Sequence, residues 1–231
     1  MMDNENSQDL IFSVIKEKCV LKQDVYENII LNFKTLKNVL KEVGDDLKDR
    51  MNDVDNRVII EYKDVDDYEA HLRIGGDILI FHMHTNVFKF DDNNSLWKTT
   101  YFKENTNRGF CGVINIYNFL SDSFKYNRMN DVGYLIARLF VNNENHFMVQ
   151  GKRQLGFLYN DFINAIIDKE SMKAIIQSAV LYSLDFDMYV APYDDVKQAS
   201  VYEMHKVSEG LRMKTGKRLG FKFNADSDEI D

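Results

Sequence analysis

The stretch "DYEAHLRIGGDILIFHMHTN", residues 67–86, decides the fold. Two runs of alternating apolar and polar residues flank the glycine pair at 75–76, and this pattern predicts a β-hairpin closed by a two-residue turn. Glycine suits this turn because both central residues of a type I′ turn need a positive φ. A two-residue turn also fixes the register of the two strands, so Glu69 is expected directly opposite His82.

The expected register divides the hairpin into two faces, because directly opposed residues share a face and the faces alternate along each strand. The first face is expected to join the core and carries Tyr68, Ala70, Leu72, Ile74, Leu79, Phe81 and Met83. The second face carries Asp67, Glu69, His71, Arg73, Ile78, Ile80, His82 and His84. Three of the five histidines in the chain therefore lie on one side of one short hairpin.

The second face has the residue types of a metal site. His82 and His84, one residue apart on a strand, present two imidazoles on one side, and the opposed Glu69 can supply a third ligand. Three protein ligands with an open fourth position suit a zinc-activated water. The expected ligands of a divalent metal such as zinc are therefore Glu69, His82 and His84, with His71 in reserve. Two other interpretations stay open: a polar face on which histidines simply pair with carboxylates, and a general acid or base role for one histidine.

Further runs with a period of two predict more strands on both sides of the hairpin. These runs cover residues 57–63, 87–90, 111–119, 133–141 and 146–151. The sequence "NNEN" at 142–145 is typical of a turn between the last two strands. Helical periodicity occurs only before and after this block of strands. The sequence therefore predicts an α+β fold with a mainly antiparallel sheet of five to seven strands.

The segment 24–54 has the clearest helical pattern. Asp24 and Glu27 resemble a capping box at its start. Its apolar stripe consists of Val25, Ile29, Phe33, Leu36, Leu40, Val43, Leu47 and Val54. The stripe fits a long helix that lies across the sheet, but it is also close to a heptad repeat, so self-association through helix 24–54 stays open. A shorter helix is expected around residues 8–19.

Helical periodicity returns in the segment 160–186, with a break near Lys169. The expected buried face of this segment consists of Phe162, Ile166, Ile167, Ile175, Ala179 and Tyr182. A last helix is expected after Pro192, with Val196, Tyr202 and Met204 as candidate core residues. These C-terminal helices are expected to pack on the sheet together with the long N-terminal helix.

Composition restricts the class of protein. Hydrophobic residues make up 45% of the 231 residues, and the chain has only one proline. We therefore expect a single domain over residues 9–223, between a disordered start at 1–8 and an acidic disordered tail at 224–231. A formal net charge of -8 argues against a nucleic-acid partner.

The expected location of the protein follows from its cysteines and its termini. Cys19 and Cys111 are too few for a disulfide framework and favour a reducing, cytoplasmic setting. The polar N-terminus has no signal pattern, and no apolar run approaches the roughly 20 residues that cross a bilayer, so no membrane partner is expected.

Four polar loops are further candidates for binding. Two of them contain aromatic residues and an arginine each, and the candidate ligand-binding residues there are Arg108, Tyr126, Asn127 and Arg128. Ordinary turn chemistry around Asn and Gly is the alternative. The echo of "GKRQLGF" at 151–157 in "GKRLGF" at 216–221 suggests two basic loops that grip an anion or nucleic acid through Lys152, Arg153, Lys217 and Arg218. The alternative is two glycine-containing turns with solvated charges, and neither loop has the spacing of a phosphate-binding loop.

Taken together, "GGDILIFHMHTNVFKF", "RGFCGVINIYNFLSDSFKYNRMNDVGYLIARLF" and "NENHFMVQGKRQLGF" resemble a family of uncharacterised proteins from Bacteroidetes-type bacteria, over roughly residues 57–200. The resemblance implies a cytoplasmic bacterial setting and no particular activity, cofactor or catalytic residue. The function expected from the sequence is a non-catalytic ligand-binding or regulatory domain, with self-association through helix 24–54 left open. The alternative is a metal-dependent, hydrolase-like enzyme that uses the histidine face, and nucleic-acid binding through the basic loops is the third hypothesis.

Overall fold

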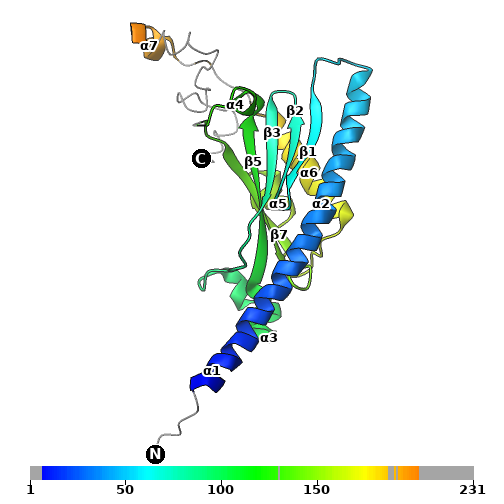
Figure 1. Ribbon diagram of the computed structural model, residues 1–231, viewed down its shortest axis with the longest axis vertical. Helices are drawn as coiled ribbons and strands as arrows, with labels where there is room; N and C mark the ends of the chain where they lie inside the picture. Colours follow the sequence, from blue (N-terminus) through cyan, green and yellow to red (C-terminus); the bar gives the residue numbers. More distant parts are fainter. Residues whose placement is uncertain (1–6, 130, 187–189, 191, 203–231) are drawn as a thin grey trace, which may run out of the picture.

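The computed structural model describes residues 7–129, 131–186, 190 and 192–202. Its centre is an antiparallel sheet with the order β1-β2-β3-β5-β6-β7, in which β4 pairs with the start of β5 (Figure 1). The strands are β1 (Ile60–Asp66), β2 (Glu69–Ile74), β3 (Asp77–Met83), β4 (Phe88–Lys89), β5 (Phe110–Leu120), β6 (Tyr134–Asn142) and β7 (Phe147–Gly151). The predicted α+β class and the antiparallel sheet are confirmed.

The hairpin of β2 and β3 has the predicted register. Glu69 pairs with His82, and Ile74 pairs with Asp77 next to the turn. Only Gly75 has a positive φ, of 57°, so the turn is not the expected type I′, in which both central residues have positive φ. A positive φ at the first central position alone is the type II′ pattern, which suits the twist of a hairpin equally well.

One unbroken helical rod runs along the sheet. It consists of α1 (Ser7–Val14), a π-helical turn η1 (Ile15–Cys19) and α2 (Val20–Asn52). The expected helix start at Asp24 and the expected separate helix over 8–19 are therefore wrong. Asp24 does not cap a helix because the preceding residues are themselves good enough helix formers to continue it. The predicted disordered start overlaps the rod at Ser7 and Gln8, and its other residues lie outside the described part of the chain.

The apolar stripe of α2 packs on the sheet, so the helix uses this face within its own chain. Val25, Ile29, Phe33, Leu36 and Leu40 are at most 1% exposed. Val54, which the stripe included in the prediction, lies beyond the end of α2 and is exposed. Of the two interpretations of the stripe, the helix lying across a sheet describes the structure.

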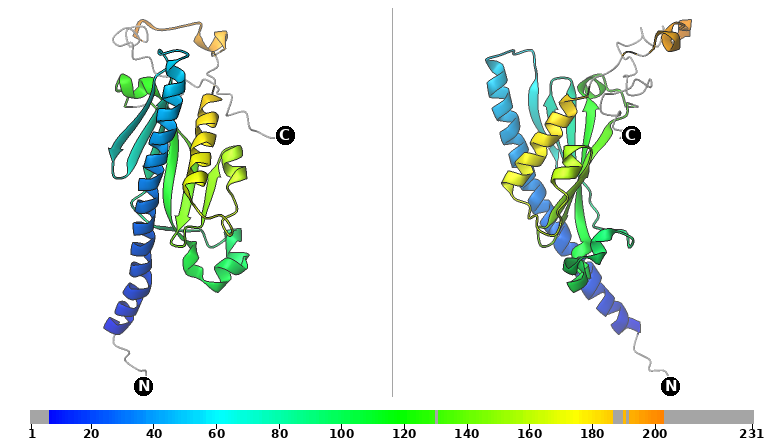
Figure 2. Two further views of the ribbon diagram at one scale, coloured as in Figure 1. Left: turned by 90° about the vertical axis from the view of Figure 1, so that its right-hand side faces the viewer. Right: turned by 180° about the vertical axis from the view of Figure 1, so that it is seen from behind.

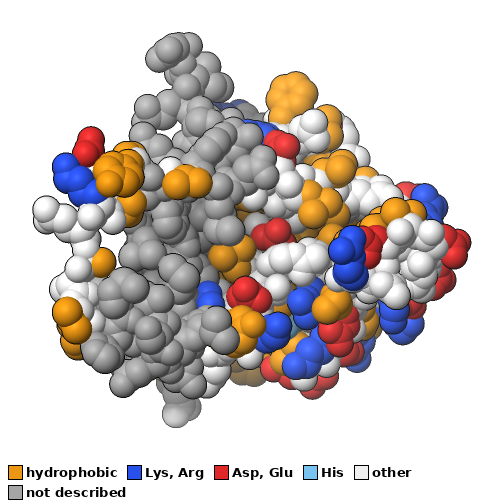
Figure 3. Space-filling model, turned by 90° about the horizontal axis from the view of Figure 1, so that it is seen from above, with side chains coloured by type: hydrophobic (Ala, Val, Ile, Leu, Met, Phe, Trp, Pro, Cys, Tyr) orange, Lys and Arg blue, Asp and Glu red, His pale blue; other side chains and the backbone are white. Residues whose placement is uncertain are grey.

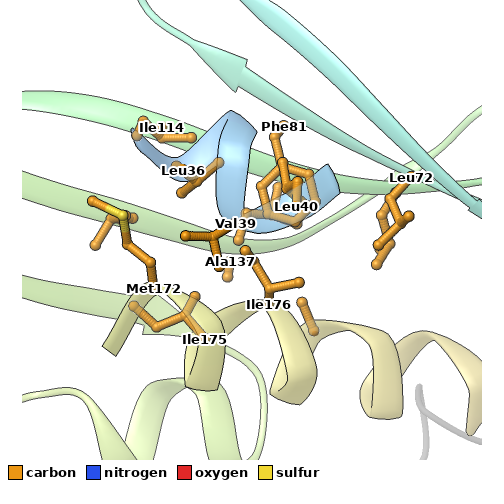
Figure 4. Packing of buried hydrophobic residues seen from close by; sticks show 14 of the residues in the cluster. Leu36, Val39, Leu40, Leu72, Phe81, Ile114, Ala137, Met172, Ile175 and Ile176 are labelled. Atoms are coloured by element: carbon orange, nitrogen blue, oxygen red, sulfur yellow. The ribbon is translucent and has the colours of Figure 1, made fainter. Parts of the chain in front are cut away.

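A second helix, α6 (Lys169–Leu184), lies beside α2 on the same face of the sheet, as the left view of Figure 2 shows. Figure 4 shows the core between the two helices and the sheet, with labelled side chains from α2, α6 and the strands. Burial of each large aliphatic or aromatic side chain here stabilises the fold by about 2 kcal/mol. Helix α2 lies close to the sheet at Gly112, where an added Cβ would lie 2.5 Å from the Cβ of Ile29.

The break expected near Lys169 is confirmed, because α6 begins there, but the residues from 160 up to this break are not the helix that was expected. The side chain of Asp168 accepts a hydrogen bond from the backbone N–H of Ser171 and caps α6, so residues before it form turns. Ile166 is consequently exposed, whereas the other five residues of its predicted buried face are buried. Val196 and Tyr202, expected in the core, are exposed as well. Met204 and the expected acidic tail lie outside the described residues.

Short helical segments complete the described chain. They are η2 (Ser95–Lys98), α3 (Thr100–Glu104), η3 (Thr106–Gly109), α4 (Ser121–Lys125), α5 (Gln154–Leu158) and α7 (Tyr193–Val196). A small second cluster of buried residues joins Phe102 of α3 to Cys111 and Phe162. In the part of the chain that the structure describes, no helix combines the length and the apolar character needed to cross a membrane.

Candidate functional site

The sheet has two different faces. Helices α2 and α6 cover one of them, and we call the opposite one the outer face. At the end of the outer face next to the β2–β3 turn, the short helix α4 packs against the strands. Between α4 and strands β1 to β3 lies a hollow of about 310 Å³, here called the basic hollow, which is lined by Glu61, Lys63, His71, Arg73, Ile78, Ser121, Phe124 and Lys125.

Cross-strand pairing positions four of these side chains. Lys63 of β1 lies opposite His71 of β2, and Glu61 lies opposite Arg73. Directly opposed residues in an antiparallel pair project from the same face with Cβ atoms about 5 Å apart. The two pairs are successive pairs on the same face, so they form a compact two-by-two group on the outer face.

The floor of the basic hollow is apolar. Ile78 pairs with Arg73 across the β2–β3 ladder and is only 8% exposed. The ring of Phe124, from α4, lies edge-on to the imidazole of His71 with 5.6 Å between centroids, and it contacts Phe119 at 5.5 Å. The hollow therefore combines charged walls with an aromatic and aliphatic floor, the usual character of a small-molecule site.

Positive charge exceeds negative charge around the basic hollow. Lys63, Arg73 and Lys125 face a single carboxylate, Glu61, in a chain whose formal net charge is -8. Within the described residues neither Lys63 nor Lys125 forms an ion pair, and the Nε of Arg73 donates to the carbonyl oxygen of Gly75 at 3.3 Å. These cations have hydrogen-bonding capacity left for an anionic ligand.

His71 is held in place by a carboxylate. Its Nε2 lies 2.6 Å from the Oε1 of Glu69, and the His71 side chain is 12% exposed. Glu69 and His71 are two residues apart on β2, so both project from the outer face. The pairing of histidine with carboxylate is the alternative to a metal site that the sequence left open.

The other histidines of the predicted metal set have separate surroundings. His82 lies opposite Glu69 as expected. His84 follows the end of β3, where its Nδ1 accepts a hydrogen bond from the backbone N–H of Asn86 at 3.0 Å and its ring packs on Phe88. Among the described residues, no group of three or more His, Cys, Asp and Glu side chains is placed to hold a metal ion. The strand register thus brings Glu69 and His82 together without assembling the expected ligand set.

Arg108, a predicted ligand-binding residue, is engaged by neighbouring groups of the protein. Its Nε donates to Glu144 at 3.0 Å, and its guanidinium lies 4.2 Å from the ring centre of Tyr101. Partial burial by itself would raise the pKa of Glu144, but hydrogen bonds from Arg108 and Tyr101 outweigh it and lower the pKa below its ordinary value. Burial raises the pKa of Tyr101 to about 12, so its hydroxyl stays protonated and donates to Glu144.

Asn142 ties this ion pair to the turn between β6 and β7. Its Oδ1 accepts from the backbone N–H groups of Glu144 and His146, and its Nδ2 donates to the Tyr101 hydroxyl and the Arg108 carbonyl oxygen. Asn142 is fully buried, and its amide makes every one of these bonds within the protein. The hydrogen-bond network around Arg108 therefore stabilises the turn between β6 and β7.

Tyr126, Asn127 and Arg128, the other predicted ligand-binding residues, lie in the loop after α4. The backbone N–H of Arg128 donates to Ser123 at 2.7 Å, its guanidinium lies 5.3 Å from the ring centre of Tyr126, and Asn127 has a φ of 49°. These three residues follow the end of β5, whereas Arg108 precedes its start. The eleven-residue strand between them keeps the two groups from forming one pocket.

The basic loops are only partly within the described chain. Arg153 pairs with Asp185, and Lys152 lies next to it. Lys217 and Arg218 fall outside the described residues. On the face seen from above in Figure 3, Lys and Arg side chains are interspersed with Asp and Glu rather than arranged in a continuous basic stripe.

The sequence did not identify four residues of the basic hollow as functional: Lys63, Arg73, Phe124 and Lys125. Arg73 was placed on the correct face of the hairpin, and Lys63 fell in a predicted strand. Two features of the hollow could not be predicted from the sequence. One is the β1–β2 register, because no short glycine turn connects these strands, and the other is the position of α4 over the strands.

Comparisons of the chain with protein-family models, with curated proteins and with solved structures found no match. The resemblance to uncharacterised bacterial proteins stays a prediction. The geometry of the basic hollow is therefore the observation that bears on function.

Proposed function

We propose that the protein is a non-catalytic binding domain whose basic hollow takes a small organic anion. The observation that carries the proposal is the meeting of Lys63, Arg73 and Lys125 over the apolar floor of Ile78 and Phe124. A hollow of about 310 Å³ matches the lower end of small-molecule sites. The cations would hold a carboxylate or phosphate group, and the floor would accept an apolar or aromatic part of the same ligand.

The surroundings of His71 support binding rather than catalysis. Its ring nitrogen is engaged by Glu69 at 2.6 Å, and Ser121, the hydroxyl residue of the hollow, makes no hydrogen bond to it within the described chain. A nucleophile and its base normally lie within about 3 Å of each other. The hollow therefore has the parts that hold an anion without the contact that would activate a serine.

The experiment that tests the proposal is calorimetric titration of the full chain with phenyl phosphate, which joins an anionic group to an apolar ring. We expect saturable binding that weakens about tenfold or more in Arg73→Gln and in Lys63→Gln, because a charge-assisted hydrogen bond contributes about 1.5–3 kcal/mol. The matched control is Lys173→Gln, an exposed lysine of α6 on the opposite side of the sheet, which should bind like the wild type. Equal weakening in the control, or no binding by the wild type, would contradict the proposal.

Three further probes separate the contributions of the anionic group and of the ring to the binding affinity. Benzoate tests whether a carboxylate replaces the phosphate, inorganic phosphate tests the anionic group alone, and phenol tests the ring alone. We expect phenyl phosphate or benzoate to bind more tightly than either fragment. Phenol binding as tightly as phenyl phosphate would show that the cations do not contribute.

We also propose that the protein works in the cytoplasm. Cys19 and Cys111 are both free thiols in the structure, and a reducing compartment keeps thiols in this state. The acidic net charge and the interspersed charges of Figure 3 give no support to a nucleic-acid partner.

A further inference from the structure

Glu61 is the single acidic residue among the described residues that line the basic hollow. Its side chain projects from the outer face, because Glu61 lies directly opposite Arg73 in the β1–β2 pairing. The residue is exposed, and within the described chain its carboxylate forms no hydrogen bond or ion pair. A carboxylate in this position repels a simple anion that enters the hollow. The hollow as a whole therefore suits a ligand that carries positive charge as well as negative charge.

Arg73 does not pair with Glu61, although the two residues are opposed. The Nε of Arg73 donates to the carbonyl oxygen of Gly75 at 3.3 Å, which ties the guanidinium to the β2–β3 turn. Helix α4 is tied to the same turn, because the backbone N–H of Ser121 donates to the carbonyl oxygen of Gly76 at 2.7 Å. The guanidinium keeps its other N–H groups, so an acid and a base present charge to one hollow without neutralising each other by direct contact.

The spacing of this acid and base restricts the ligand. Directly opposed residues of an antiparallel pair have Cβ atoms about 5 Å apart. A ligand that contacts both Glu61 and Arg73 must therefore carry its positive and its negative group close together. An α-amino acid has this arrangement, because its ammonium and carboxylate groups are attached to one carbon atom. Its side chain leaves the same carbon atom and is available to the floor of the hollow.

We propose that the ligand of the basic hollow is an amino acid with an aromatic side chain. This inference rests on the proposed function, because it names the class of organic anion that the same site takes. Arg73 binds the carboxylate, and Glu61 accepts hydrogen bonds from the ammonium group. The ring of the ligand lies on the floor that Ile78 and Phe124 form. Phe124 is 46% exposed, so its own ring has surface left for an aromatic contact.

Other small ligands match fewer of these groups. A simple aromatic acid leaves the carboxylate of Glu61 without a partner and is repelled by it. An aromatic amine satisfies Glu61 but meets the three cations Lys63, Arg73 and Lys125. Inorganic phosphate makes no use of the apolar floor. An aromatic amino acid engages the acid, the cations and the floor together.

Calorimetric titration of the full chain with three probes that share one ring tests the inference. The probes are phenylalanine, phenylpropionate, which lacks the ammonium group, and phenylethylamine, which lacks the carboxylate. We expect phenylalanine to bind about fivefold or more tightly than phenylpropionate, because the ammonium group forms charge-assisted hydrogen bonds with Glu61. Phenylethylamine should bind most weakly, because the cations of the hollow repel it.

Glu61→Gln should change the affinities of two ligands in opposite directions. Phenylalanine should bind about fivefold or more weakly, because its ammonium group loses a charged partner. Phenylpropionate should bind about two- to threefold more tightly, because the variant no longer repels it. A folding defect cannot produce both changes. The matched control is Glu42→Gln, the same substitution at an exposed position of α2 on the opposite side of the sheet, which should bind both ligands like the wild type.

The outcomes separate this inference from the proposed function. If the wild type binds phenyl phosphate and phenylpropionate but binds phenylalanine no more tightly than phenylpropionate, the amino acid is excluded and the anion site stands. If the wild type binds neither phenyl phosphate nor any of the three probes, both proposals fail. If Glu61→Gln weakens phenylalanine and phenylpropionate equally, Glu61 acts on the shape of the hollow and the assigned ammonium contact is wrong.

Discussion

Lys63 on strand β1 lies directly opposite His71 on strand β2, and the next pair on the same face is Glu61 with Arg73. The basic hollow depends on this register. A slip of one residue in β1 would turn Lys63 and Glu61 to the face that packs against the helices. The same alternation that builds the core on one side of the sheet therefore gathers the cations on the other.

Phe124 provides the apolar part of the proposed ligand contact. It is 46% exposed, so Phe124→Ala removes ring surface from the hollow with little loss of core packing. We expect binding of phenyl phosphate to weaken about fivefold, corresponding to about 1 kcal/mol of lost ring contact. Inorganic phosphate, which has no ring, should bind as before. Calorimetric titration with both probes measures the difference, and an equal loss for both would show that Phe124 acts by holding α4 in place.

Gly112 sets the distance between α2 and the sheet. Its added Cβ would lie 2.5 Å from the Cβ of Ile29, and both atoms belong to rigid elements. We expect Gly112→Ala to lower the free energy of unfolding by about 3 kcal/mol through overpacking. Gly76→Ala is the control, because no atom lies within 4 Å of its added Cβ. Chemical denaturation of both variants is the measurement, and a neutral Gly112→Ala would mean that the helix can move away freely.

Asn118 and Asn142 are two fully buried asparagines of the sheet with opposite hydrogen-bonding states. Neither side-chain polar atom of Asn118 has a partner within the described structure, whereas the amide of Asn142 makes four hydrogen bonds. A buried polar group without partners costs about 1–3 kcal/mol. We therefore expect Asn118→Val to raise the free energy of unfolding by about 1 kcal/mol, with the strand preference of valine adding to the effect.

The same substitution at the second asparagine should have the opposite sign. Asn142→Val leaves several buried groups unpaired and should lower the free energy of unfolding by about 3 kcal/mol. Denaturation curves of the two variants, measured side by side, test the contrast. A stabilised Asn142→Val, or a strongly destabilised Asn118→Val, would be incompatible with the hydrogen bonds described here.

The ion pair of Glu144 and Arg108 gives stability a dependence on pH. The pKa of Glu144 is lower in the folded protein than its ordinary value of 4.5, so its contribution is present above that value and is lost as the pH falls through the folded pKa. In Glu144→Gln this contribution is absent at every pH. We expect the difference in unfolding free energy between wild type and variant to be largest near neutral pH and to shrink in acid. A difference that stays constant would contradict the lowered pKa.

Local patterns in the sequence predicted most of the sheet. The glycine turn and the alternation in 67–86 predicted the pairing of Glu69 with His82, and the NNEN turn marked the β6–β7 connection. The helix boundaries were less predictable. The capping pattern at Asp24 was overridden because residues 7–19 extend the helix before it. The predicted break near Lys169 matches the start of α6, which Asp168 caps, but the apolar pattern also suggested a helix before this break, where the chain forms turns.

The site was harder to predict from the sequence than the fold. The basic hollow joins β1, β2 and α4, and the side chains of Lys63 and Lys125 are 62 positions apart in the chain. Local periodicity determines which face a residue occupies, but it does not determine which distant segment covers that face. Arg108 is a residue that the sequence predicted to bind a ligand but that contacts Glu144 and Tyr101 of the protein itself. These partners are distant in the sequence or in a different loop position, so the local pattern did not reveal them.

The most direct test of the account is to map phenyl phosphate on the protein by NMR. In a titration of the ¹⁵N-labelled chain, we expect the largest saturable changes in amide chemical shift at Lys63, His71 and Arg73 and along α4, with small changes across α6. Changes confined to other regions, such as the Lys152–Arg153 turn, or no saturable change at all, would contradict the assignment of the basic hollow as the ligand site.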